Sequence, residues 1–147
     1  MIRRLIAALA IVLSLVSCSW SDDAKDANRS LQGTWLPSSA ELAGKKLPDE
    51  VVKTIKLVLE DDKYTVTVGK GIDRGTCKLD PKAKPRTLDI TGTEGPNKGK
   101  KILAIYERKG DTLRVCYDLS GKSRPTEFAT KAGTQLFLVS YKREKSE

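Results

Sequence analysis

Arginine and carboxylate side chains in the second half of the chain are the residues best suited to chemistry or binding. The polar set comprises Tyr106, Glu107, Asp111, Arg114, Arg124 and Glu127. Arg114 and Arg124, with Tyr106 and Glu127 nearby in the sequence, could form an anion-binding site, because guanidinium groups bind carboxylate or phosphate through paired hydrogen bonds. The alternative, which we favour, is that Arg–Glu pairs only hold neighbouring strands together.

The chain lacks the usual residues of acid–base and metal chemistry. It contains no histidine, which excludes His-dependent triads, His metal ligands and His general acid–base catalysis. Glu107 and Glu127 could cleave a glycoside only if their carboxyl groups lay ~5–9 Å apart, and nothing in the sequence places them so. We therefore expect no catalytic residues, no metal, no cofactor and no enzymatic activity.

Three cysteines are present: Cys18, Cys77 and Cys116. In an exported protein, Cys77 and Cys116 could form a disulfide. We favour two separate buried thiols, because the strands predicted to carry them are not neighbours in a meander. Two cysteines without histidine also lack a tetrahedral set of metal ligands.

The N-terminus has the features of an export signal. Arg3 and Arg4 precede an apolar run over 5–16, which is shorter than the ~20 residues that a spanning helix needs. The run ends in Leu-Val-Ser-Cys18, which resembles the lipobox of bacterial lipoproteins. That resemblance implies cleavage after 1–17, lipidation of Cys18 and anchoring in the cell envelope, in the outer membrane rather than the inner because Ser follows the cysteine. An ordinary signal peptide with an incidental cysteine is the alternative.

The chain is basic, with 27 Lys and Arg against 19 Asp and Glu and a net charge of +8. Loss of 1–17 lowers this charge by two. Basic proteins often bind nucleic acid, but export argues against that partner. The polyanions of an envelope remain possible partners, although we favour a solvated surface because the lysines are scattered along the sequence.

Short alternating segments predict an all-β domain over 31–143, preceded by a polar tether over 18–30 and followed by a polar tail over 144–147. The predicted strands are 33–36, 55–60, 63–69, 72–79, 87–91, 101–107, 112–118, 127–129 and 134–142, with a helical turn near 48–54. Tight turns join most of them, so an antiparallel up-and-down meander of about eight strands is expected. Closure into a barrel would remove its edges; an open curved sheet or a sandwich is the alternative.

Gly33-Thr34-Trp35 on the first strand resembles the Gly-x-Trp opening of lipocalins and their calycin relatives. In that family, the Trp closes one end of the barrel beneath an Arg of the last strand. The resemblance therefore implies a lipocalin-like barrel closed by Trp35 and Arg143, packed by a cation–π contact.

A second resemblance covers nearly the whole domain. Four segments resemble an uncharacterised domain family that is abundant in planctomycete bacteria: Leu-Gln-Gly-Thr-Trp35, Gly-Pro-Asn-Lys-Gly99, Gly-Asp-Thr-Leu-Arg-Val-Cys-Tyr117 and Arg-Pro-Thr-Glu-Phe128. Members of that family are typically secreted or lipid-anchored, or are fused to other modules. No activity is established for that family, so it carries no site residues over to this chain.

Together these observations predict a lipid-anchored envelope protein with a non-catalytic binding or interaction domain. Its expected partners are the membrane, through the lipid anchor, and a small apolar molecule or an envelope polymer or protein. Nucleic acid is not expected, and the protein is expected to be a monomer. A carboxylate-dependent envelope hydrolase and a purely structural or inhibitory lipoprotein are the alternative functions.

Overall fold

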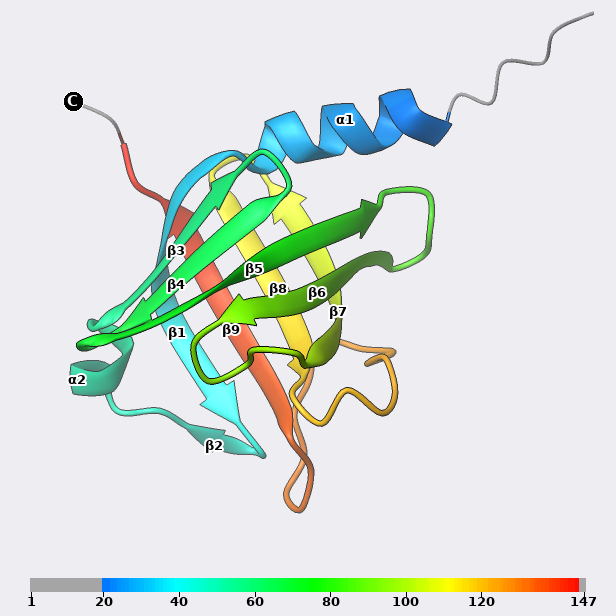
Figure 1. Cartoon of the computed structure of the whole chain (residues 1–147). Coiled ribbons are helices and arrows are strands. Elements are labelled where there is room, and N and C mark those ends of the chain that lie inside the picture. The colour runs from blue at the N-terminus through cyan, green and yellow to red at the C-terminus, as the bar shows by residue number, and fades with distance from the viewer. Residues whose placement is uncertain (1–19, 146–147) are drawn as a thin grey trace, which may run out of the picture.

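The computed structural model describes the backbone of residues 20–145 and the side chains of 24–145. The domain is a closed antiparallel β-barrel of eight strands with one additional short strand, lipocalin-like as predicted (Figure 1). The elements are α1 (Trp20–Leu31), β1 (Gly33–Leu42), β2 (Lys45–Lys46), α2 (Asp49–Val52), β3 (Ile55–Glu60), β4 (Lys63–Val68), β5 (Gly71–Asp80), β6 (Arg86–Glu94), β7 (Lys101–Lys109), β8 (Thr112–Asp118) and β9 (Leu136–Arg143).

β2 only extends the end of β1, and β1 pairs with β3. From β3 to β9 each strand pairs with the next along the chain, and β1 pairs with β9 to close the sheet. The hairpins arise from alternation and turn chemistry. Tyr64 and Val66 of β4 face inward, while Thr65 and Thr67 face outward. At the β3–β4 turn Asp61 has a φ of 55°, a left-handed conformation that Asp tolerates better than most residues.

The up-and-down order sorts the connections into two ends. The β3–β4, β5–β6 and β7–β8 turns lie at the end covered by α1, which we call the closed end. The β4–β5, β6–β7 and β8–β9 connections, together with β2 and α2, lie at the opposite end, which we call the open end. Alternate turns of an antiparallel meander must fall at the same end, because each strand reverses the direction of the chain.

Trp35 fills the closed end, where it is fully buried. Its indole Nε1 donates to the Leu31 carbonyl oxygen at 2.9 Å. The Arg143 guanidinium lies over the Trp35 ring, 4.3 Å from its centroid. Arg143 also donates to the carbonyl oxygens of Ser30, at 2.6 Å, and Gln32. The two residues thus connect the last strand to the end of α1.

Three local predictions were wrong. Residues 20–31 form a helix instead of an irregular tether, because Ala27 and Leu31 pack against the core. The first strand continues beyond residue 36 to Leu42, since its second half pairs with β9. Residues 127–129 are not a strand. They belong to the connection over 119–135, which lies on the outer wall, where Arg124 bonds the Ala104 carbonyl oxygen at 2.8 Å.

The described helices include none that is both long and apolar enough to cross a membrane. Cys18 and residues 1–17, to which the lipidation and export predictions refer, lie outside the described residues.

Candidate functional site

A cavity of about 340 Å³ lies inside the barrel. This volume falls within the ~300–1,000 Å³ typical of ligand pockets. The wall is mainly aliphatic and aromatic. Its inner surface includes Leu57, Val66, Leu79, Leu88, Ile90, Ile102, Leu113, Val115 and Phe137. The side chains therefore leave the barrel hollow and present carbon atoms to its interior.

The cavity reaches solvent at the open end. Leu42, Val51 and Val68 line it and yet are 36%, 39% and 48% exposed. We call these three residues the mouth. They come from β1, α2 and β4, so three separate elements supply the apolar rim. Aliphatic side chains that are exposed to this extent are unfavourable in water. Their contact with an apolar ligand would remove that surface from water and lower the free energy.

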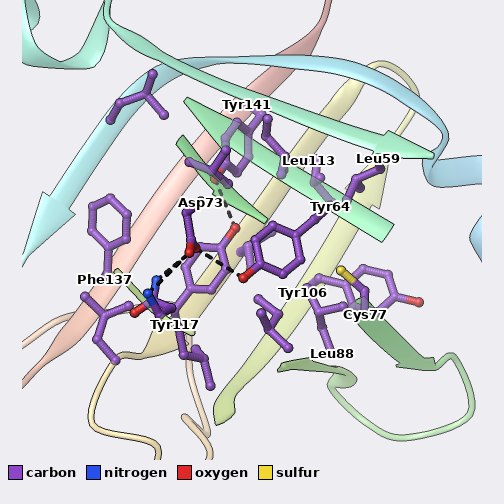
Figure 2. A pocket seen from close by; sticks show the side chains of 18 of the residues that line it. Leu59, Tyr64, Asp73, Cys77, Leu88, Tyr106, Leu113, Tyr117, Phe137 and Tyr141 are labelled. Atoms are coloured by element: carbon purple, nitrogen blue, oxygen red, sulfur yellow. Dashed lines mark hydrogen bonds between the residues drawn. The ribbon is translucent and has the colours of Figure 1, made fainter. Parts of the chain in front are cut away.

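A hydrogen-bonded polar cluster lies near the mouth, because Asp73 is paired with Val66, two residues before Val68. Figure 2 shows Asp73 and Tyr64 of this cluster. The Tyr64 hydroxyl donates to the Asp73 carboxylate at 3.1 Å, and the Asn97 side-chain amide donates to the same oxygen at 2.9 Å. The Asn97 backbone N–H donates to the other oxygen at 3.3 Å. Asp73 thus ties β4 and β5 to the β6–β7 connection. Burial and the neighbouring Asp73 charge raise the pKa of Tyr64 far above its ordinary value.

A second polar pair lies deeper in the barrel. The hydroxyl oxygens of Tyr117 and Tyr141 are 3.0 Å apart and hydrogen-bonded (Figure 2). Burial raises the pKa of both, that of Tyr141 to about 12. Burial also raises the pKa of the Cys77 thiol to about 12. All three groups are therefore neutral at physiological pH.

Arg114 and Arg124 do not form a shared anion site. Arg114 points outward from β8, bonds Glu107 at 3.2 Å and lies over the Phe128 ring at 4.3 Å. Arg124 bonds the Asp89 carboxylate at 2.5 Å. Each guanidinium has its own partner on the outer wall: Arg114 joins β8 to β7, and Arg124 holds the connection over 119–135 to β6 and β7. The anion clamp, which was the less favoured interpretation, is not formed by these two residues. The favoured structural pairing describes both, with Glu107 as the partner of Arg114 and Asp89 in place of a Glu as the partner of Arg124.

The other predicted polar residues are also dispersed. Tyr106 is buried on the inner wall, whereas the adjacent Glu107 faces outward toward Arg114. Glu127 is exposed on the connection over 119–135. Residue alternation along β7 places Tyr106 and Glu107 on opposite faces. The structure therefore does not bring Tyr106 and the two arginines into one site.

Both cysteines of the domain are free. Cys77 lines the cavity, whereas Cys116 points outward, 3.6 Å from the Ala129 carbonyl oxygen. The barrel wall separates the two thiols, so the disulfide alternative is wrong. Among the described residues, no cluster of three or more Cys, Asp or Glu could hold a metal ion.

Tyr64, Asp73 and Asn97 were missed by the sequence analysis as site residues. A usable signal existed for Asp73, because it shares strand parity with Cys77 and Leu79 and so faces the same side. The Asp73 carboxylate is stable inside the barrel because Asn97 donates hydrogen bonds to it. Asn97 lies in the β6–β7 connection, and the alternation pattern does not predict the path of that connection.

Comparison with known proteins assigns no family to this geometry. A scan against protein-family models and searches of curated proteins and solved structures found no match to the chain. The planctomycete resemblance stays a prediction, and function has to be argued from the cavity itself.

Proposed function

We propose that the chain is an exported protein, lipid-anchored through Cys18, whose barrel binds a small apolar or amphipathic molecule without transforming it. The observation that carries this proposal is the cavity of about 340 Å³ with an apolar wall and an exposed apolar mouth. Transfer of apolar ligand surface from water into such a site is favourable by ~25 cal/mol per Å².

The polar groups of the cavity support binding over catalysis. The Asp73 carboxylate already accepts hydrogen bonds from Tyr64 and Asn97. The hydroxyls of Tyr117 and Tyr141 bond each other. These groups satisfy one another, so a ligand would meet mainly carbon atoms with a few oriented dipoles.

The binding proposal is tested by filling the cavity from one wall. Val66 lines the cavity, whereas Val58 faces outward from the neighbouring strand in the same hairpin, and both are half-buried. We expect the neutral fluorophore N-phenylnaphthylamine to bind saturably with one site per chain. Val66→Phe should weaken this binding tenfold or more, and Val58→Phe should leave it unchanged. Absence of saturable binding, or equal affinities for the two variants, would overturn the proposal.

The anchor is tested separately in a bacterial host that processes lipoproteins. We expect the wild-type chain to partition into detergent with the mass of an acylated protein that begins at Cys18. Cys18→Ser should lose both properties. Unchanged mass and partitioning in this variant would exclude the anchor without affecting the binding proposal.

A further inference from the structure

The open end of the barrel collects lysines that are scattered along the sequence. They lie on β2, just after α2, on the β4–β5 turn, around the β6–β7 connection and on the connection over 119–135. All are exposed: Lys45, Lys46, Lys53, Lys70, Lys98, Lys100, Lys101, Lys122 and Lys131. We call this set the lysine ring. These charges are dispersed along the sequence, and the up-and-down topology brings them to one end.

Few opposite charges balance the lysine ring. None of its lysines forms an ion pair with a described residue. Of the carboxylates at this end, Glu94 pairs with Arg74 at 3.1 Å. Glu41 lies opposite Lys46 in the β1–β2 ladder and accepts a hydrogen bond from the Thr130 hydroxyl. Asp118 is occupied by Ser120 and the Ser123 backbone N–H, and these hydrogen bonds to its carboxylate outweigh desolvation and lower its pKa. Asp49 and Glu50 of α2 remain. The open end is therefore a positive surface.

The interior of the cavity disfavours anions, in contrast to the open end. The cavity beneath the mouth contains the Asp73 carboxylate, whose oxygens already accept three hydrogen bonds. An anionic group placed beside Asp73 would be repelled by that carboxylate and would lose its water. The lysine that lines the cavity, Lys63, lies at the β3–β4 turn of the closed end, away from the mouth. The same group at the mouth would stay hydrated and close to several ammonium groups. An apolar chain, in contrast, gains most inside the cavity.

We propose that the ligand is an anionic amphiphile with a single apolar chain, of the long-chain carboxylate class. Its chain enters between Leu42, Val51 and Val68, and its headgroup stays at the lysine ring. This inference rests on the proposed binding function and adds the chemical class of the ligand and its direction of entry.

The test compares dodecanoate with the uncharged dodecanol, which has the same carbon chain. Lys70→Glu/Lys98→Glu changes two lysines of the ring. Lys84→Glu/Lys142→Glu makes the same change in net charge at the closed end, where both lysines are exposed. We expect the first variant to weaken dodecanoate binding tenfold or more and the second by less than twofold. Dodecanol binding should not change in either variant, and added salt should weaken only dodecanoate binding.

Three results would overturn this inference. Equal effects of the two double variants on dodecanoate binding would exclude recognition at the lysine ring. A loss of dodecanol binding in the lysine-ring variant as large as its loss of dodecanoate binding would show that the substitutions act on the cavity and not on the headgroup. Binding to anionic phospholipid vesicles without binding of free dodecanoate would identify the open end as a membrane-docking surface. If dodecanol and N-phenylnaphthylamine still bind, the proposed function stands; if no probe binds, both proposals fail.

Discussion

Replacement of Arg143 by Met should destabilise the domain by a predictable amount. The guanidinium contacts the Trp35 ring at 4.3 Å, donates to the Ser30 and Gln32 carbonyl oxygens, and pairs with Asp111 at 3.4 Å. Met retains much of the aliphatic length of the side chain. The substitution therefore removes the charge and the hydrogen bonds while it retains apolar cover for the indole.

The magnitude follows from these contacts. A cation–π contact at a partly buried site contributes ~0.5–2 kcal/mol. Hydrogen bonds from a charged donor contribute roughly 1.5–3 kcal/mol each, but water can reach part of this site and replace some of that gain. The Asp111 carboxylate is 72% exposed, so that ion pair adds little. We expect a total loss of about 2–4 kcal/mol in the free energy of unfolding.

Equilibrium unfolding in urea, followed by far-UV circular dichroism, measures this loss. The midpoint should fall while the slope with urea stays constant, since the same surface is exposed on unfolding. Arg108→Met is the matched control, because Arg108 donates within its own turn, to the Gly110 carbonyl oxygen at 2.8 Å. That variant should lose less than ~1 kcal/mol. Equal losses in the two variants would refute the assignment of Arg143 as the residue that fastens the closed end.

Two further predictions concern the inner wall. Cys77 and Tyr141 have pKa values raised from 9.0 and 10.0 to about 12 in the folded protein. As the pH rises, these two groups therefore ionise in the unfolded chain before they ionise in the folded protein. Their contribution to the free energy of unfolding should be constant below pH 9 and fall as the pH rises toward 12. A urea midpoint that does not change over this range would contradict the burial of these groups. Gly75→Ala should destabilise the domain by ~1–3 kcal/mol, because the new Cβ would lie 2.6 Å from the Tyr64 ring and overlap the Thr91 carbonyl oxygen. In Gly71→Ala on the same strand the nearest atom is 3.4 Å away, so thermal unfolding that ranks the two variants equally would show that this close packing is unimportant.

The fold was predictable wherever local pattern and turn chemistry agreed. The β3–β4 and β7–β8 hairpins were expected at nearly their observed bounds, since alternation and short turns determine their register locally. The second half of β1 was missed, because it is paired by β9 from the far end of the chain. Residues 127–129 were misassigned for the converse reason: they have no strand partner, and side chains of β8 contact them, with Arg114 over the Phe128 ring and the Cys116 thiol near the Ala129 carbonyl oxygen.

The candidate site was less predictable than the fold. Arg114 and Arg124 are the strongest candidates in the sequence, because guanidinium groups can bind anions. Whether they do so depends on which carboxylates already pair with them. Strand pairing brings Glu107 to Arg114, and the path of the connection over 119–135 brings Arg124 to Asp89. The strand parity of Asp73 indicated that it faces inward, but its partner Asn97 lies in the β6–β7 connection, which the alternation pattern does not place.

The sequence by itself determined the all-β class, the hairpins and the expectation of closure, because these follow from alternation and turns that act over a few residues. It also determined that histidine chemistry is excluded. Only the tertiary structure decided that the barrel is hollow, that Cys77 and Cys116 lie on opposite sides of its wall, and that distant lysines share the open end. The cavity volume, the side of the wall on which each thiol lies and the clustering of the lysines all depend on how closure of the barrel arranges residues from many strands in space. The spacing of residues within any one strand does not contain that information.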